Sequence, residues 1–218
     1  MPPRRLVLFD LDGTITRHDS FPPFVWGLVA RHPLRWLRLP LLGLPFAAFT
    51  LRLIGRGTLK GSLLRLMLGG LPRSAVADWV RDYASQVVPA RLFSEAVAAF
   101  QQHLRAGDHV VVVSASPDLY VPEIARLLGA HEVFCTPIRW RDGRLDGRLA
   151  GPNCRDHEKD RVLQQLRRAH PGLPVIAYGN SVEDLIHMQH CEQAVYVNPT
   201  PRMQAMLERM GIPGVFWR

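Results

Sequence analysis

The stretch LVLFDLDGT, residues 6–14, decides the fold, because four apolar residues run directly into two aspartates. A short, continuous apolar run is typical of a parallel strand that is buried on both faces and delivers polar residues at its carboxyl end. Three later runs have the same character: His109–Val113, Val175–Tyr178 and Ala194–Val197. The sequence therefore predicts a buried parallel sheet with the two aspartates at its ligand-binding edge.

Helical patterns alternate with these strands, at Ser94–Leu104, Pro122–Leu128, Lys159–Arg168 and Val182–His190. This alternation predicts an α/β fold built on a doubly wound parallel sheet. The segments Val133–Arg141 and Arg144–Leu149 flank an Asp142–Gly143 turn, which predicts a hairpin in addition.

Residues 17–92 interrupt the alternation, because they are helical in pattern, rich in leucine and punctuated by Pro33, Pro40 and Pro45. We interpret them as a helical cap domain inserted after the first strand, with residues 1–16 and 93–218 forming the catalytic core. The apolar run near the N-terminus is too short for a signal peptide, and acids interrupt it, so we expect a cytoplasmic location.

The net charge of +8 is concentrated in this predicted cap. Between Asp19 and Asp78 there is no acid, whereas the same stretch holds eight basic residues; the rest of the chain has 19 basic and 19 acidic residues. Such local charge indicates one anion-facing or membrane-facing element and not a diffuse nucleic-acid-binding surface. We infer no nucleic-acid partner, and the sequence indicates no protein partner.

Within the cap, residues 37–57 read LRLPLLGLPFAAFTLRLIGRG, which is apolar, basic and free of acids. Leu39–Leu51 is almost continuously apolar, but at about 1.5 Å per residue it reaches roughly 20 Å, too short to span a bilayer. Arginines bracket it, and Trp36 lies nearby, as in segments that lie in the membrane interface. We predict contact with an anionic membrane surface; the alternative is that this stretch is the buried core of a helical cap. We expect Trp26 and Trp36 to lie in the core of the cap and not to act as specific ligands.

Asp10 and Asp12 stand two residues apart at a strand end, where two carboxylates can divide the work of phosphoryl transfer. One attacks phosphorus and becomes an aspartyl-phosphate, while the other protonates the leaving oxygen and then activates water. After the second strand, the Ser114 hydroxyl and nearby backbone N–H groups, such as that of Ala115, can hold a phosphate oxygen. Lys159 can offset the charge of the nucleophile and of the phosphoryl group.

The loop Asn180–Asp184 follows the third strand and offers an acid that can hold a hard cation. Magnesium fits, because it prefers a few carboxylates, a carbonyl and several waters, and it shields a phosphate dianion from the attacking carboxylate.

Taken in order, FDLDGT, VVVVSAS, a lysine and YGNSVED resemble the four motifs of the haloacid dehalogenase superfamily. The helical insert directly after the first motif is similar to the phosphoserine-phosphatase-like branch. The resemblance implies a Rossmann-like core with Asp10 as nucleophile and Asp12 as acid and base. It also implies Ser114 and Lys159 as phosphate ligands, and Mg²⁺ held by Asp10, the carbonyl of Asp12 and Asp184.

One position departs from that pattern, since Asn180 stands where the fourth motif often has an acid. Its amide oxygen can ligate magnesium or orient a ligand water but brings no charge. At the entry to the cap, Asp19 faces the substrate or simply caps a helix, and Arg56 is a further candidate for substrate contact.

These observations predict a magnesium-dependent phosphomonoester hydrolase. The apolar, basic cap resembles that of phosphatidylglycerophosphatase C and its relatives. This resemblance implies that the substrate is a phospholipid head-group phosphate, such as phosphatidylglycerophosphate, and that the enzyme lies at the inner face of the membrane. Two alternatives stay open: a soluble phosphatase of small metabolites such as phosphoserine, and a non-enzymatic protein that binds anionic lipid.

Overall fold

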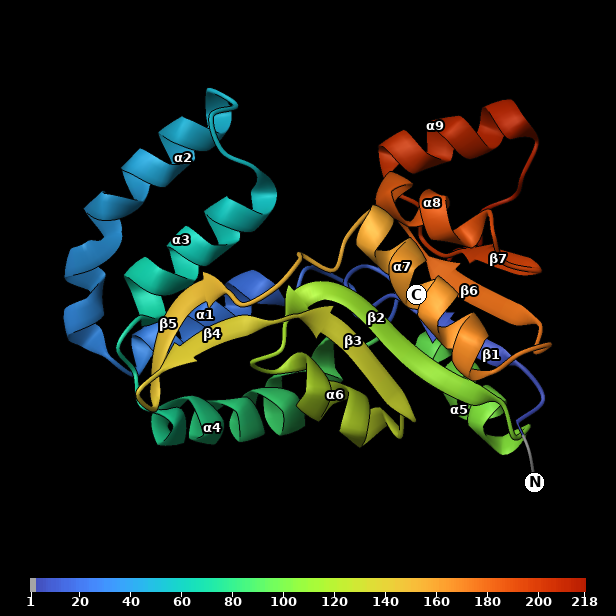
Figure 1. The fold of residues 1–218 in the computed structure, drawn as a ribbon, viewed down its shortest axis with the longest axis horizontal. Helices are drawn as coiled ribbons and strands as arrows, with labels where there is room; N and C mark the ends of the chain where they lie inside the picture. Colours follow the sequence, from blue (N-terminus) through green and yellow to red (C-terminus); the bar gives the residue numbers. More distant parts are fainter. Residues whose placement is uncertain (1–2) are drawn as a thin grey trace.

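The computed structural model describes residues 3–218, and its centre is a parallel sheet of five strands in the order β3-β2-β1-β6-β7 (Figure 1). β1 lies in the middle, with Leu6 opposite His109 of β2 on one side and Val175 of β6 on the other. The strands are β1 (Leu6–Phe9), β2 (His109–Pro117), β3 (Glu132–Thr136), β6 (Val175–Gly179) and β7 (Gln193–Tyr196). The predicted parallel sheet and the α/β class are confirmed.

Helices cover both faces of this sheet, because side chains of successive strand residues point to opposite faces. Val7 and Phe9 of β1 pack in one core cluster with α5 and α6, whereas Leu6 and Leu8 pack in a second cluster with α7, α8 and α9. These helices are α5 (Ser94–Arg105), α6 (Val121–Leu128), α7 (His157–Ala169), α8 (Leu185–Met188), preceded by the 3-10 turn η4 (Val182–Asp184), and α9 (Pro201–Met210). The four helical patterns of the sequence are confirmed, and α9 was not predicted.

The hairpin forms, but the interpretation of 133–141 as one strand was wrong. β3 belongs to the parallel sheet, and a separate strand, β4 (Ile138–Arg141), pairs with β5 (Arg144–Leu149). Pro137, which has no N–H to donate to a ladder, stands between β3 and β4. At the turn, Asp142 and Gly143 have φ values of 49° and 72°, as a two-residue hairpin turn requires.

Between β1 and α5 the chain is helical, and these helices lie to one side of the sheet in Figure 1. The hairpin joins them, because it packs along α3: Leu149 lies against Gly61, and the backbone of Leu145 exchanges hydrogen bonds with Gly70 and Leu71. The elements of this segment are α1 (Phe21–Ala30), the 3-10 helix η1 (Pro33–Leu42), α2 (Gly43–Thr50), α3 (Arg56–Leu68), α4 (Arg73–Asp82), the π-helical turn η2 (Tyr83–Val87) and the 3-10 turn η3 (Pro89–Arg91).

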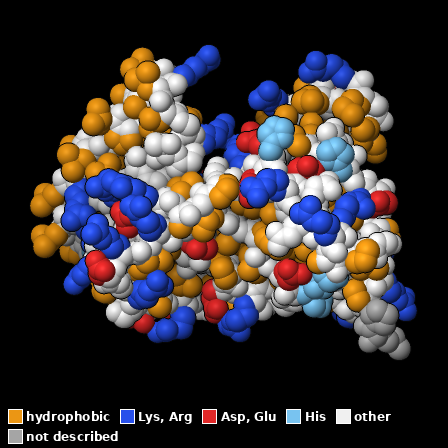
Figure 2. All heavy atoms as spheres, in the orientation of Figure 1, with side chains coloured by type: hydrophobic (Ala, Val, Ile, Leu, Met, Phe, Trp, Pro, Cys, Tyr) orange, Lys and Arg blue, Asp and Glu red, His pale blue; other side chains and the backbone are white. Residues whose placement is uncertain are grey.

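The outer edge of this helical segment exposes large apolar side chains, which we call the apolar ridge. Figure 2 shows hydrophobic side chains gathered where Figure 1 draws α2 and the chain leading to it. α2 has no buried residue, although its composition is apolar. The ridge consists of Trp26, Leu34, Trp36, Leu37, Leu41, Leu44, Phe46, Leu51 and Leu53, which are between 39% and 81% exposed.

The placement of Trp26 and Trp36 in the core of the cap was wrong. Their rings stack on each other, with centroids 5.8 Å apart and planes inclined by 8°, and both are about two-fifths exposed. Of the helices in residues 3–218, none is long and apolar enough to cross a bilayer.

Candidate active site

A cleft of ≈ 700 Å³ opens where the carboxyl ends of β1, β2 and β6 face helix α3, and the notch is visible in Figure 2. The sheet side of the cleft carries Asp10, Asp12, Ala115, Ser116, Lys159 and the loop Asn180–Asp184. The helical side carries Asp19, Arg56, Leu59, Lys60 and Leu63. Residues that are far apart in the sequence thus meet at the edge of the sheet where parallel α/β folds bind ligands.

Lys159 ties two of the predicted acids together. It lies in the first turn of α7, is 3% exposed, and its Nζ donates to Asp10 Oδ1 at 2.5 Å and to Asp184 Oδ1 at 2.6 Å. Burial alone would lower the pKa of Lys159, but the two carboxylates outweigh burial and raise it above its usual value. The lysine therefore remains a cation.

The two acids respond in opposite directions to this shared cation. Burial raises the pKa of Asp10, and the nearby carboxylates of Asp184 and Asp12 raise it further, against the effect of Lys159. Burial also acts on Asp184, but there Lys159 and the Ser181 hydroxyl outweigh it, so that its pKa lies below the usual range. Because one ammonium group is shared by two buried carboxylates, an ionised Asp10 needs a further positive charge nearby to be stable.

The donor set around these acids fits magnesium. Asp184 Oδ2 accepts hydrogen bonds from the Ser181 hydroxyl at 2.8 Å and the Ser181 N–H at 3.1 Å, which fixes the carboxylate toward the cleft. The Asn180 side chain lies against the loop after β1, since a Cβ added to Gly13 would stand 2.1 Å from Asn180 Nδ2. The carboxylate side chains of Asp10 and Asp184 and the amide side chain of Asn180 line the cleft at this end, and their oxygens are of the hard kind that magnesium prefers.

Asp12 joins three parts of the chain. Its Oδ1 accepts the N–H of Ser20 at 2.7 Å, and its Oδ2 accepts the hydroxyl of Ser116 at 2.6 Å. The Ser20 hydroxyl is in turn 2.9 Å from the hydroxyl of buried Tyr120. The carboxylate is thus held at the junction between the first loop, the entry to α1 and the end of β2.

The second motif is arranged differently from the sequence prediction. Ser114 is fully buried, its Oγ accepts the N–H of Ser116 at 3.0 Å, and it is not among the residues that line the cleft. Ala115 and Ser116 line the cleft instead. Sequence reasoning missed Ser116, although it is the second serine of the same SAS triplet.

Lys60 is the functional candidate that sequence reasoning missed most clearly. It reaches from α3 across the cleft, and its Nζ donates to the carbonyl of Ala115 and, at 3.0 Å, to Asn153 Oδ1. Burial lowers its pKa to about 8, against the opposing effect of Asp12 and Asp19. A signal was present, because this arginine-rich chain has two lysines, Lys60 and Lys159, and both line the cleft.

The two residues predicted at the entry to the cap both line the cleft. Asp19 Oδ1 also accepts the N–H of Phe21, the first residue of α1, at 2.8 Å, so Asp19 both lines the cleft and contacts the start of the helix. Arg56 opens α3 and is exposed at the mouth of the cleft.

Comparisons with known proteins agree with this geometry. A family model of haloacid dehalogenase-like hydrolases matches residues 7–189. Protein CicA of Caulobacter vibrioides is 37% identical over 165 residues, which are 74% of this chain and 72% of CicA. A probable phosphatase of Mycobacterium tuberculosis is 30% identical over 208 residues, which are 90% of this chain and 69% of that protein. A solved substrate-bound phosphoserine phosphatase has the same fold, with a TM-score of 0.67, 16% identity, and coverage of 94% of this chain and 91% of its own.

Proposed function

Since this chain belongs to the haloacid dehalogenase-like hydrolases and is a phosphatase of that family, we propose that it hydrolyses a phosphomonoester through an aspartyl-phosphate on Asp10. The observation that carries the proposal is the placement of Asp10, Asp184 and the Lys159 ammonium, within hydrogen-bonding distance at the floor of a cleft. A carboxylate nucleophile beside a fixed cation is the arrangement that phosphoryl transfer to an aspartate needs.

In the first step a carboxylate oxygen of Asp10 attacks phosphorus, and the bond from phosphorus to the ester oxygen breaks. Asp12 gives its proton to that oxygen, so the alcohol leaves neutral. In the second step Asp12 takes a proton from a water that attacks the same phosphorus, and the bond to Asp10 breaks, releasing inorganic phosphate. Lys159 and the backbone N–H of Ala115 would hold the phosphoryl oxygens, with Ser114 behind them.

We propose that Mg²⁺ is held by the carboxylates of Asp10 and Asp184 and by the carbonyl of Asp12. Asn180, which is neutral, would contribute its amide oxygen or orient a ligand water. When bound, the ion would supply the charge that one lysine cannot, shielding the phosphate dianion from the Asp10 carboxylate.

For the substrate we propose a phospholipid head-group phosphate such as phosphatidylglycerophosphate. The support comes from the apolar ridge, because contiguous exposed apolar surface of this kind marks an interaction site in soluble proteins. Arg52 and Arg56 are exposed beside the ridge on the chain from α2 to α3, and their charge favours an anionic bilayer over another apolar protein. Arg56 also lines the cleft and follows the ridge residue Leu53 by three residues, so the chain that carries the ridge leads directly to the cleft.

We further propose that residues 17–92 act as a cap domain over the core, joined by the hairpin β4–β5. Docked through the ridge, this cap would lie on the membrane with the mouth of the cleft facing the lipid head groups. The rival substrate class is a soluble metabolite, for which the phosphoserine phosphatase fold is the precedent.

A comparison of substrates tests the proposal. The purified protein with magnesium is assayed for phosphate release from phosphatidylglycerophosphate in anionic vesicles, from the same lipid in neutral detergent micelles, and from phosphoserine. We expect the fastest turnover on vesicles and no release when chelator is in excess. Faster turnover of phosphoserine than of the lipid in either form would overturn the lipid substrate and leave a metabolite phosphatase.

A further inference from the structure

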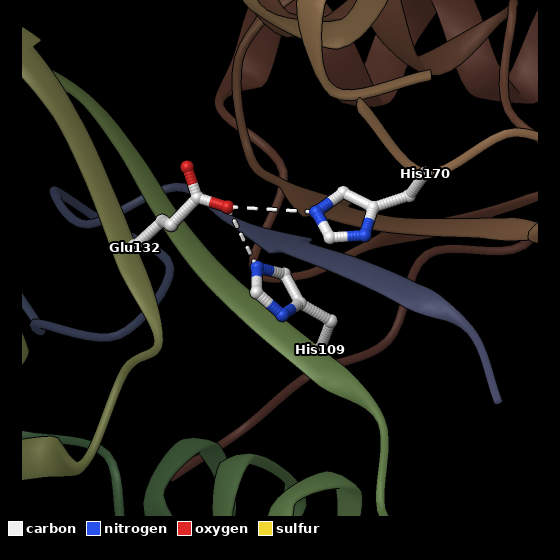
Figure 3. A group of neighbouring side chains, drawn as sticks. All are labelled: His109, Glu132 and His170. Carbon is white, nitrogen blue, oxygen red and sulfur yellow. Dashed lines mark hydrogen bonds and ion pairs between the residues drawn. The ribbon is translucent and has the colours of Figure 1, made fainter. Parts of the chain in front are cut away.

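A second cluster of ionisable side chains lies at the end of the sheet opposite to the cleft. His109 begins β2, Glu132 begins β3, and His170 directly follows α7 (Figure 3). His109 and the cleft residue Ser116 stand near opposite ends of β2, seven residues apart, which at about 3.3 Å per residue is roughly 23 Å. This cluster is therefore separate from the hydrolytic site.

The three side chains converge on a single point. The Glu132 Oε1 is 2.7 Å from His109 Nε2 and 3.7 Å from His170 Nε2, and the possible ligand atoms all lie within 4.8 Å of one another. A tetrahedral zinc ion, with bonds of about 2.0–2.1 Å, needs ligand atoms about 3.3 Å apart. Small side-chain rotations would bring these three atoms to that separation, and partial exposure of all three leaves an entry path for an ion.

From this convergence we propose that His109, Glu132 and His170 form a binding site for a divalent transition-metal ion, of which Zn²⁺ fits best. Two imidazoles and one carboxylate are ligands that zinc takes readily, and water would complete the tetrahedron. Magnesium and calcium are disfavoured here because they prefer oxygen ligands. The bound ion would link β2, β3 and the end of α7, and so hold the sheet to the helix that carries Lys159 at its other end.

A third histidine, next to the cluster, provides a matched control. His131 stacks on His109, with ring centroids 4.9 Å apart, but its Nδ1 accepts the N–H of Val110 at 3.0 Å. Its remaining ring nitrogen then carries the proton and cannot bind a metal ion. Replacing His131 should therefore leave the metal site intact.

Zinc titration of the chelator-treated full chain tests the proposal, with magnesium in excess to occupy the hydrolytic site. We expect one zinc per chain at micromolar concentration. At zinc one hundred times its Kd, we expect a rise in Tm of about 5 °C or more. His109→Ala, Glu132→Gln and His170→Ala should each weaken zinc binding at least tenfold, whereas His131→Asn should bind like the wild type.

Cobalt distinguishes this site from the three free cysteines, Cys135, Cys154 and Cys191. The cobalt-loaded protein should show d–d absorption bands without the strong thiolate-to-cobalt bands in the near ultraviolet, and His170→Ala should abolish them. The proposal is overturned if the wild type binds no zinc at micromolar concentration. It is also overturned if His109→Ala and His170→Ala, folded by circular dichroism, bind zinc as tightly as the wild type.

Discussion

Replacing Leu37 and Leu44 together by glutamine should weaken binding to anionic vesicles without weakening the fold. Both side chains lie on the apolar ridge, 79% and 80% exposed, so they contribute little to packing. Complete burial of a leucine is worth about 1.5–3 kcal/mol. If each side chain immerses about half of its exposed surface, the pair contributes about 2 kcal/mol, which is roughly a 30-fold change in partition.

Co-sedimentation with vesicles of phosphatidylglycerol and phosphatidylcholine measures this partition. Because the lost term is apolar, the 30-fold difference should persist when salt is raised. A second variant, Arg52→Gln with Arg56→Gln, should show a loss that is largest at low salt and shrinks as salt screens the charges. Arg35 is unsuitable for this purpose, because its Nη1 donates to the carbonyls of Met67 and Gly69 at the end of α3.

Leu127→Gln is the control for an exposed leucine elsewhere, since Leu127 is 49% exposed on α6, which packs on the sheet. It should bind vesicles within about twofold of the wild type, because its apolar surface is outside the ridge. The reasoning is refuted if the Leu37 and Leu44 double variant sediments like the wild type. It is also refuted if the wild type stays in the supernatant at low salt with strongly anionic vesicles. A soluble metabolite would then be the favoured substrate class.

Three further substitutions test the site and its surroundings. Gly13→Ala should lower the free energy of unfolding by about 1–3 kcal/mol and reduce kcat, because the φ of Gly13 is +82° and the new Cβ would meet Asn180. Gly107→Ala is the control, since Gly107 has a φ of +77° but open space around it. In the same denaturation and activity assays, this variant should keep full kcat. Lys60→Met should lower kcat/KM about 10–100-fold at pH 7. The ratio of the wild-type kcat/KM to that of the variant should shrink as pH rises through about 8, where the Lys60 ammonium loses its proton. A ratio that stays constant from pH 6 to 9 would show that the charge of Lys60 does not contribute. Burial lowers the pKa of His187 to about 4, so this side chain favours the folded state only while it is neutral. The free energy of unfolding, measured in urea titrations, should therefore fall by up to about 3 kcal/mol as pH falls from 6.5 to 4. His187→Asn should make this dependence on pH weaker.

The sequence predicted best those elements whose residue pattern is compatible with a single kind of secondary structure. The apolar run Leu6–Phe9 forms β1 with the predicted bounds, because a strand buried on both faces needs apolar residues at every position. The pairing of Val133–Arg141 failed because a continuous strand-like pattern does not reveal where the chain leaves one sheet for another. Pro137 marks that point in the sequence, but only the tertiary structure shows that β3 pairs with β2.

The exposure of the ridge was left open by the sequence for a related reason. A run that is apolar all round, such as Leu39–Leu51, fits both a buried helix and a surface that meets lipid, and composition alone does not distinguish them. The structure decides the exposure of the side chains, since Leu44 is 80% exposed and α2 buries none of its residues.

In the site, the motif residues were predictable, and so were Asp19 and Arg56 after the first motif, whereas Lys60 was not. Asp10, Asp12, Lys159 and Asp184 follow strand ends or begin a helix in a fixed order along the core, so their meeting could be anticipated. Lys60 lies on a helix of the insert with no motif around it, and its place over the cleft depends on how α3 packs. Ser116 was missed because residues two apart on a regular strand share a face, and the sequence does not reveal the shift of register between Val113 and Pro117 at the end of β2.

The most direct test of the account is chemical trapping of the intermediate on Asp10. The protein is mixed with substrate and magnesium, quenched in acid within one turnover, and reduced with borohydride, which converts an aspartyl-phosphate into homoserine. Peptide mass spectrometry should find homoserine at position 10 of the wild-type protein. Turnover of wild-type protein without modification at Asp10, or undiminished turnover of undeamidated Asp10→Asn protein, would contradict the proposed mechanism.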